Sequence, residues 1–326
     1  MSFRRHIFHQ QLKKMNKHKL TRRQFVQQST VLLGGLATPS VISSFASHFS
    51  EIKRAKHIGL QLYSVREDVK KDPKGTLQKL AAMGYKELEP AAYIYPEAYT
   101  KRVIYGYSPK EFRKIADDLG LKIPSSHVVF SMKHWDDSKN DMTDIWKQVV
   151  EDALIMGQKY IISPWFDADK TKLDAVKKGI EIYNKVGVLT AKAGLRFGFH
   201  NHHQEFTQKF DDEYLYDIML KGFDLKYVCQ QLDICNMSIA NVDPMRWLKM
   251  FPNHFELLHV KDRDKMKPES TLLGDGALKM AEILDFARTK TKTKYWVIEQ
   301  ESYGDKTPLE CVKIDLERFK TQFKFG

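Results

Sequence analysis

The sequence is poor in cysteine and lacks a glycine-rich phosphate loop, a low-complexity segment and any internal repeat larger than a strand–helix unit. Its 326 residues include only Cys229, Cys235 and Cys311, which form no CxxC pair. An odd number of cysteines without metal-ligand spacing excludes a disulfide framework. We therefore expect three buried thiols that behave as small hydrophobic residues.

Acidic residues are absent from positions 1–23, where eight basic residues gather: Arg4, Arg5, Lys13, Lys14, Lys17, Lys19, Arg22 and Arg23. The net charge of +12 less these eight leaves +4 for the other 303 residues. A nucleic-acid-binding domain concentrates its basic excess on the folded part. The charge distribution therefore argues against DNA or RNA as a partner.

The same N-terminal region has the order of an export signal. Residues 21–26 read TRRQFV and resemble the twin-arginine motif, and residues 24–46 carry no charge. Residues 31–37 form an apolar core that is too short to remain as a membrane-spanning helix. Residues 44–46 (SFA) offer a small-x-small cleavage site.

We therefore predict a leader at 1–46, export through the twin-arginine route to the periplasm, and no membrane attachment after cleavage. A disordered basic tail on a cytoplasmic protein is the alternative. Translation starts at Met1 or at Met15, because residues 1–14 add nothing that the signal needs.

From residue 56 onward, short apolar runs alternate with longer amphipathic segments. The predicted strands are 58–62, 85–89, 122–126, 160–163, 196–199, 228–232, 255–258 and 295–298. The predicted helices are 73–83, 109–119, 143–156, 172–193, 213–220, 244–250, 277–289 and 308–320. Gly84, Gly120, Gly157 and Gly194 stand where C-cap glycines are expected. Eight units in strict alternation predict a single (β/α)8 TIM barrel at 47–326.

In a TIM barrel, polar residues at the carboxyl ends of strands form the site. Every predicted strand ends in such residues: Gln61 and Tyr63; Glu89; His127; Ser163 and Trp165; His200, Asn201 and His202; Gln231 and Asp233; His259 and Lys261; Glu299 and Glu301. Strand alternation turns one residue of each of the last four strands inward at a similar height.

We predict that these four residues, His200, Asp233, His259 and Glu299, bind one divalent metal ion. Their nitrogen and oxygen donors suit Mn²⁺, Zn²⁺, Co²⁺ or Fe²⁺ better than Ca²⁺ or Mg²⁺. His202 shares a strand face with His200 and is the alternative ligand.

Five short segments carry a family resemblance: residues 58–64 (IGLQLYS), 199–202 (FHNH), 232–233 (LD), 259–262 (HVKD) and 297–299 (VIE). In this order, one per strand, they resemble the sugar phosphate isomerase/epimerase superfamily of xylose-isomerase-like TIM barrels. The resemblance covers roughly residues 56–322.

The resemblance implies a metal held by Glu, Asp, His and Glu from strands 5 to 8. Asp233, His259 and Glu299 match the last three, whereas His200 stands where the sugar epimerases usually have the first glutamate of Glu-Asn-His. In those enzymes the two glutamates also form the acid/base pair. The exchange keeps a ligand but removes one carboxylate base, which favours one-base chemistry.

The hypothesis is therefore an enzyme that removes a proton next to a sugar carbonyl. Candidate catalytic residues are His127 (the first choice, because imidazole titrates near neutrality), Glu89, Lys261 and His202. Candidate substrate-binding residues are Gln61, Tyr63, Trp165, Gln231 and Glu301. The connections 93–107 and 131–141 are candidate lids, with Tyr93 and Trp135 as candidate sugar-ring walls.

The expected partner is a small unphosphorylated sugar or keto-glycoside, because exported enzymes meet few sugar phosphates; the chain is also a possible homo-oligomer. A sugar dehydratase or keto-glycoside lyase on the same site is the first alternative to an isomerase or epimerase. A metal-stabilised sugar-binding protein without turnover is another. An apurinic-site endonuclease is the least favoured alternative, since such an enzyme needs a richer metal-ligand set and a basic groove.

Overall fold

A computed structural model describes residues 57–93 and 96–325. The predicted leader, its cleavage site and both candidate start residues lie outside the described residues. Within those two ranges, no helix combines the length and the apolar composition that a membrane crossing needs.

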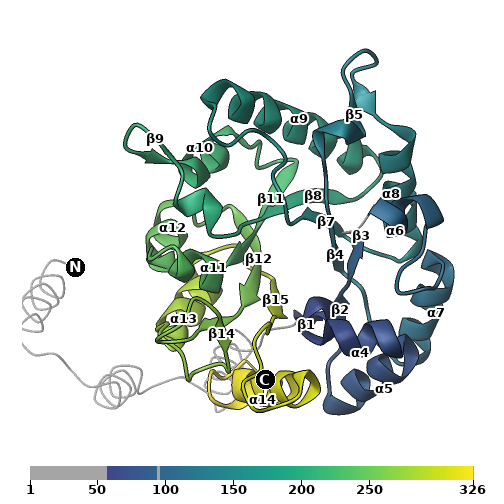
Figure 1. The fold of residues 1–326 in the computed structure, drawn as a ribbon, viewed down its shortest axis with the longest axis vertical. Helices are drawn as coiled ribbons and strands as arrows, with labels where there is room; N and C mark the ends of the chain where they lie inside the picture. The colour runs from purple at the N-terminus through teal and green to yellow at the C-terminus, as the bar shows by residue number, and fades with distance from the viewer. Residues whose placement is uncertain (1–56, 94–95, 326) are drawn as a thin grey trace, which may run out of the picture. The chain divides into compact units, whose positions relative to one another are not determined.

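Nine parallel strands form one sheet that curls into a barrel, with helices around it (Figure 1). The strands are β1 (His57–Gln61), β2 (Glu87–Glu89), β3 (Ala91–Tyr93), β4 (Ser125–Val128), β7 (Tyr160–Ser163), β8 (Arg196–His200), β11 (Val228–Asp233), β12 (Phe255–Val260) and β15 (Tyr295–Ile298). Their order in the sheet is β2-β1-β15-β12-β11-β8-β7-β4-β3. The predicted TIM barrel is confirmed.

The two outermost strands of the sheet, β2 and β3, are consecutive in the chain and are separated only by Pro90. Proline has no N–H to donate to a strand ladder, so the second strand is interrupted there. The Leu88 N–H donates to the Lys122 carbonyl and the His127 N–H donates to the Pro90 carbonyl, both within 2.9 Å. These bonds close the ring across the break.

The second and third strands differ from the prediction. The sequence predicted one uninterrupted strand at 85–89, whereas the structure has two short ones because of Pro90. The third strand was predicted at 122–126, and β4 begins three residues later at Ser125. Pro124 explains the shift, because proline is tolerated before a strand but not within its ladder.

Eleven α-helices surround the barrel in the described residues: α4 (Arg66–Lys71), α5 (Pro73–Met83), α6 (Pro96–Lys101), α7 (Pro109–Asp118), α8 (Asp144–Ile155), α9 (Leu173–Lys192), α10 (Leu215–Gly222), α11 (Ile234–Ile239), α12 (Pro244–Met250), α13 (Met280–Lys290) and α14 (Pro308–Thr321). Eight of them match the predicted helices. The other three, α4, α6 and α11, have only six residues each and are too short for a helical periodicity to show.

Local signals explain most helix ends. Ser108 and Thr307 form capping boxes at the starts of α7 and α14, where each side chain accepts from the backbone N–H three residues on. The four predicted C-cap glycines have φ between 68° and 99°, the left-handed region that favours glycine. The predicted C-caps are therefore confirmed.

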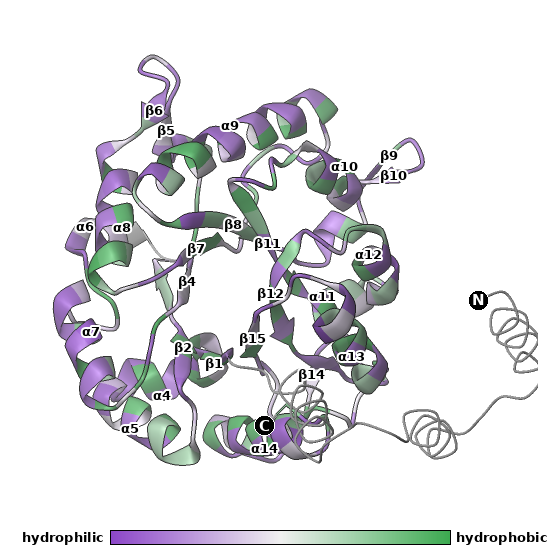
Figure 2. Cartoon of the chain, turned by 180° about the vertical axis from the view of Figure 1, so that it is seen from behind, coloured by the Kyte–Doolittle hydropathy of each residue, from purple (hydrophilic) through white to green (hydrophobic). Residues whose placement is uncertain are grey.

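Two layers of apolar packing hold the fold together. The larger one fills the space between strands and helices, and Figure 2 shows apolar residues along the strands while many helices carry both polar and apolar residues. A second cluster contains Tyr160, Ile162, Cys229, Leu257 and Tyr295. Strand alternation places Cys229 and Leu257 on the same inward faces as Gln231 and His259, two residues on, so this cluster is the barrel floor.

All three cysteines are buried and free, as predicted. Three two-stranded hairpins lie outside the barrel: β5–β6 (Trp135–Asp136 and Asp141–Met142), β9–β10 (Lys209–Phe210 and Glu213–Tyr214) and β13–β14 (Asp262–Arg263 and Ser270–Thr271). The connection 131–141, a predicted lid, folds into the first of them.

Candidate metal centre

Four buried side chains from consecutive barrel strands converge at the carboxyl end. His200 ends β8, Asp233 ends β11, His259 lies on β12 and Glu299 directly follows β15. One nitrogen or oxygen from each lies within 4.8 Å of the others. The His259 Nδ1 is 3.0 Å from Glu299 Oε2 and 4.0 Å from Asp233 Oδ2, and the His200 Nε2 is 3.9 Å from Asp233 Oδ2.

The ring nitrogens that face away from this group each have a partner. The His259 Nε2 lies 2.7 Å from Glu89 Oε1, and the His200 Nδ1 lies 3.0 Å from Gln231 Oε1. A neutral ring that carries its proton on this nitrogen has a lone pair on His200 Nε2 or His259 Nδ1. Although burial opposes it, Glu299 and Glu89 raise the His259 pKa to about 10, so a bound metal ion would replace the proton on Nδ1. Histidines that bind metals typically have such an outer partner, which fixes the tautomer and the ring direction. The donor set therefore fits a divalent ion.

Glu89 is the centre of the hydrogen-bond network beneath the four ligands. Its two oxygens accept from Gln61 Nε2 at 2.8 Å, Gln231 Nε2 at 2.8 Å, the Ser125 hydroxyl and His259. Burial opposes the charged form, but His127, His259 and Ser125 together lower the Glu89 pKa to about 2. Glu89 is thus an ionised carboxylate in a fixed position and a weak base.

Gln231 joins the two sides of this network. Because its amide nitrogen donates to Glu89, its Oε1 must face the imidazoles, where it accepts from His200 and from His127 Nε2 at 2.7 Å. Burial lowers the pKa of His127 despite the nearby Glu89 carboxylate. His127 is therefore neutral at pH 7 and, with its proton on Nε2, can accept one on Nδ1.

The Lys261 ammonium bridges three carboxylates at the upper edge of the group. Its Nζ lies 3.1 Å from Asp233 Oδ2, 3.0 Å from Glu299 Oε2 and 2.6 Å from Glu301 Oε1. Although burial alone would lower it, these carboxylates raise the Lys261 pKa well above its usual value. Lys261 is therefore a charged donor, held by two of the ligand carboxylates and not by Asp262.

Backbone contacts fix the height of Asp233 in the barrel. Its Oδ1 accepts from the Asn236 N–H at 2.7 Å as the N-cap of α11, which leaves Oδ2 for the ligand group. The side chain of Asn201 accepts from the Asp233 N–H at 2.9 Å and donates to the Asp233 carbonyl at 3.0 Å. Both contacts extend the β8–β11 pairing one step beyond the end of β8.

Two further predicted residues, His202 and Glu301, lie outside the group of four candidate ligands. His202 is half-buried, with its ring 5.1 Å from the His200 ring and 6.1 Å from that of Trp165. The described group of four contains His200 and not His202. The Glu301 side chain is 41% exposed, so it faces the opening.

Aromatic residues divide into exposed and buried sets. Trp165 is 43% exposed beside Lys170, whose Nζ lies 4.6 Å from the ring centre, and half-buried Tyr63 lines a cavity of about 410 Å³. Tyr93 is buried with its hydroxyl donating to Asp152 on α8, and Trp135 is buried in the β5–β6 hairpin. Tyr93 is therefore bonded into the layer between strands and helices.

Sequence reasoning missed two residues that contact predicted site residues: Ser125, which bonds Glu89, and Arg66, which lies over Tyr63. Ser125 donates to Glu89 and shares a strand face with His127, so alternation back from His127 would have found it. Arg66 donates to the Tyr303 hydroxyl at 2.7 Å and lies over the Tyr63 ring. Their 237-residue separation leaves no sequence signal for this contact.

Together, the barrel and its cluster of two imidazoles and two carboxylates define a TIM-barrel protein with a candidate metal site at the carboxyl ends of its strands. Residues 77–322 match the family model of the xylose isomerase-like TIM barrel. The chain belongs to this family, as its motifs predicted.

Solved structures with the same fold include a sugar phosphate isomerase/epimerase from Parabacteroides distasonis, with 28% identity and a TM-score of 0.70 over 82% of this chain and 95% of that one. A D-psicose 3-epimerase with D-fructose has 14% identity and a TM-score of 0.59, over 83% of this chain and 100% of that one. The probable 3-DHS dehydratase AsbF from Bacillus anthracis has 12% identity and a TM-score of 0.59, over 82% of this chain and 99% of that one. The last two likenesses show the fold alone. No curated protein matches the chain.

Proposed function

We propose that this protein is a divalent-metal-dependent enzyme of the sugar isomerase/epimerase type that removes a proton next to a sugar carbonyl. The observation that carries the proposal is the group of four buried ligand atoms, in which each imidazole has a fixed outer partner. Buried clusters of carboxylates and imidazoles with shifted pKa values are typical of sites that serve chemistry.

His200, Asp233, His259 and Glu299 would hold the metal ion. When bound, such an ion supplies Lewis acidity to the oxygens of a sugar carbonyl and its neighbouring hydroxyl. The mixed nitrogen and oxygen donors favour Mn²⁺, Zn²⁺, Co²⁺ or Fe²⁺.

Two residues of the chain would handle the proton and the developing charge: His127 as the base and Lys261 as the hydrogen-bond donor. Neutral His127 is the base that accepts the proton at Nδ1, since the low pKa of Glu89 makes that carboxylate a poor acceptor. Lys261 uses its three donors on Asp233, Glu299 and Glu301, so one of these bonds, the one to half-exposed Glu301, would be exchanged for a bond to an oxygen that gains negative charge. Glu89 and Gln231 orient the imidazoles.

Deuterium exchange tests the proposed step directly. Purified protein, loaded with each candidate metal in turn, is incubated in D₂O with a panel of keto-sugars and keto-glycosides, and ¹H NMR follows the C–H signal next to the carbonyl. We expect metal-dependent loss of that C–H signal for at least one substrate. In His127→Gln we expect the signal to persist, because no exchange takes place. Sugar binding without exchange in any preparation would instead identify a binding protein.

Elimination is a second candidate, favoured by the imidazole at position 200. Two-base epimerisation needs a second proton-transferring group on the opposite face of the carbon, whereas the site combines one neutral base, His127, with one charged donor, Lys261. This pair suits loss of water or of an aglycone next to the carbonyl. The same NMR experiment separates the two, because elimination yields an alkene proton signal and a released group, whereas epimerisation yields neither.

We also propose that the protein is exported and acts on an unphosphorylated sugar. The TRRQFV segment at 21–26 and the charge-free stretch at 24–46 support this proposal. Replacing Arg22 and Arg23 together by lysine is expected to retain the protein in the cytoplasm, as measured by cell fractionation. An unchanged distribution between fractions would contradict export by the twin-arginine route.

A further inference from the structure

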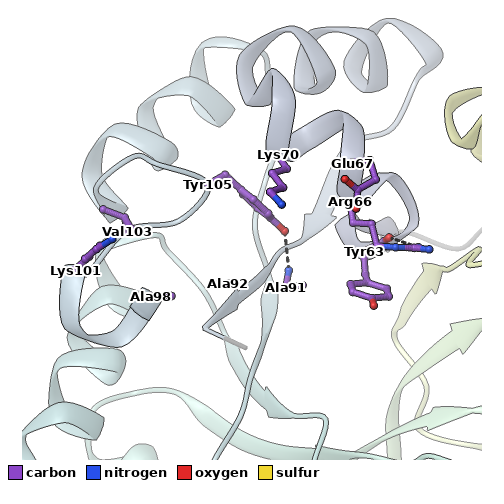
Figure 3. A pocket seen from close by; sticks show the side chains of 10 residues that line it. All are labelled: Tyr63, Arg66, Glu67, Lys70, Ala91, Ala92, Ala98, Lys101, Val103 and Tyr105. Carbon is purple, nitrogen blue, oxygen red and sulfur yellow. Dashed lines mark hydrogen bonds between the residues drawn. The ribbon is translucent and has the colours of Figure 1, made fainter. Parts of the chain in front are cut away.

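Ten residues line a cavity of about 410 Å³ (Figure 3), within the size range of roughly 300–1,000 Å³ typical of small-molecule sites. Its lining has three kinds of residue: the aromatic Tyr63 and Tyr105, the small apolar Ala91, Ala92, Ala98 and Val103, and the charged Arg66, Glu67, Lys70 and Lys101. Neither the four candidate ligands nor His127 lines it.

Two chain segments connect the cavity to the metal centre. Gln61 and Glu89, which are bonded at 2.8 Å in the network under the ligands, are each followed two residues later by a cavity residue, Tyr63 and Ala91. Parallel strands run in the same direction, so both segments emerge at the carboxyl end of the barrel. The cavity is therefore a side extension of that face.

A second connection follows the chain after β15. Lys261 bonds Glu301, and two residues later the Tyr303 hydroxyl accepts from Arg66, which lines the cavity. The Arg66 guanidinium lies 4.7 Å from the centre of the Tyr63 ring and 5.6 Å from that of Tyr303. These contacts hold the guanidinium in one place at the edge of the cavity.

The chemistry of the walls selects the occupant. Alanine methyl groups and tyrosine rings present flat apolar surface, with the Tyr105 ring fixed because its hydroxyl accepts from the Ala91 N–H at 3.0 Å. Among the described residues, Arg66 and Lys70 have no carboxylate partner, and cations outnumber Glu67 at the rim. Such a site fits a flat ring that carries hydrogen-bond acceptors at its outer edge.

We propose that this cavity is a subsite for the aglycone of a glycoside substrate, with a flat ring against Tyr63 and Tyr105 and its acceptor groups toward Arg66 and Lys70. The inference rests on the proposed function in that it takes the substrate to be a sugar derivative reacting at the metal centre. It narrows that substrate from a free sugar to a ring-bearing glycoside.

Ligand-observed NMR on the full chain tests the subsite without turnover. The probes are 4-nitrophenyl β-D-glucopyranoside and methyl β-D-glucopyranoside, which differ only in the aglycone. We expect saturation transfer to the aryl protons, and a dissociation constant at least about tenfold lower for the aryl glycoside. No transfer to the aryl protons at millimolar concentration, or equal affinity for the two probes, would overturn the inference.

Filling the cavity supplies the matched variant. Ala98→Phe on α6 places a ring in the cavity and is expected to abolish the aryl advantage while leaving metal content unchanged. Ala281→Phe, at an exposed alanine of α13, is the control and keeps the advantage. If Ala98→Phe does not fold, Tyr63→Ala removes one wall and is expected to reduce aryl transfer severalfold; full transfer in either cavity variant contradicts the subsite.

The experiments distinguish failure of the aglycone subsite from failure of the proposed enzyme function. Aryl contact that is lost in the cavity variants supports the subsite even if no deuterium exchange is found at any carbonyl. Exchange on free keto-sugars without aryl contact supports the proposed function and overturns the subsite.

Discussion

The two halves of the barrel contribute to the candidate metal centre in different ways. The strands β8, β11, β12 and β15 supply the four ligand atoms, whereas β1, β2 and β4 supply the residues that hold them: Gln61, Glu89, Ser125 and His127. The half with β8, β11, β12 and β15 thus carries the candidate ligands together with Gln231, the outer partner of His200. The half with β1, β2 and β4 holds His259 through Glu89, so changes in it are expected to weaken the site and not to abolish it.

Removing a ligand charge is expected to have the largest effect. In Asp233→Asn the cap of α11 survives on Oδ1, but the anionic ligand oxygen is lost. We expect metal affinity to fall by more than about 100-fold, the upper end for outer-partner changes, as measured by calorimetry and elemental analysis. Asp243→Asn is the control, because Asp243 caps α12 in the same way without joining the site.

Removing the cation that bridges the ligand carboxylates is expected to destabilise the metal-free protein. Lys261→Met breaks the buried ion pairs with Asp233 and Glu299 and leaves protonated His259 as the remaining cation beside them, which costs about 3–5 kcal/mol of unfolding free energy. Added metal is expected to restore most of that loss in thermal unfolding. Lys170→Met, which removes the ion-pair partner of buried Glu205, is the control that metal leaves unrepaired.

Changes in the supporting half are expected to be milder. Glu89→Gln removes the carboxylate behind His259 and is expected to lower metal affinity by roughly 10–100-fold, measured by competition with a chelator. Glu87→Gln is the matched control on the same strand, where Glu87 bonds His57 at 2.6 Å. Equal losses in both variants would mean that the effect is structural and would break the distinction between the halves.

A buried acid outside both halves is expected to give the smallest effect. Burial raises the Asp315 pKa to about 7, and its Oδ2 has no hydrogen-bond partner while Oδ1 accepts from the Leu273 N–H. The folded protein thus keeps a proton that the unfolded chain releases near pH 4.

The stability contributed by that proton is fully present below about pH 4 and is lost as the pH rises through about 7. We expect the unfolding free energy to fall by roughly 1–2 kcal/mol between about pH 5 and pH 7, and Asp315→Asn to remove this slope in denaturant titrations. The slope is expected to be the same with and without metal. A slope that persists in the variant would show that another group is responsible.

The sequence predicted the ligand half of the site better than the supporting half, for a physical reason. The strands before His200, Asp233, His259 and Glu299 are uninterrupted, so their ends and inward faces follow from apolar runs and alternation. Proline breaks the second strand and delays the third. Ser125 was missed because only polar residues at strand ends were taken as candidates, and Ser125 lies at the start of β4.

Long-range contacts were the other limit. The sequence placed Glu89 and Lys261 at strand ends, but not the bonds that make one an outer partner of His259 and the other a bridge between carboxylates. Side-chain direction beyond the strand end depends on neighbours 28 to 170 residues away. The contact of Arg66 with Tyr303 is of the same kind.

Asn201 has a consequence for how such a barrel can acquire new chemistry. Its amide pairs with both backbone groups of Asp233, so the spacing between β8 and β11 at ligand height does not depend on the side chain at position 200. A carboxylate or an imidazole can therefore occupy that position over an unchanged scaffold. His200→Glu is accordingly a one-residue path toward a paired-carboxylate site, available without rebuilding the fold.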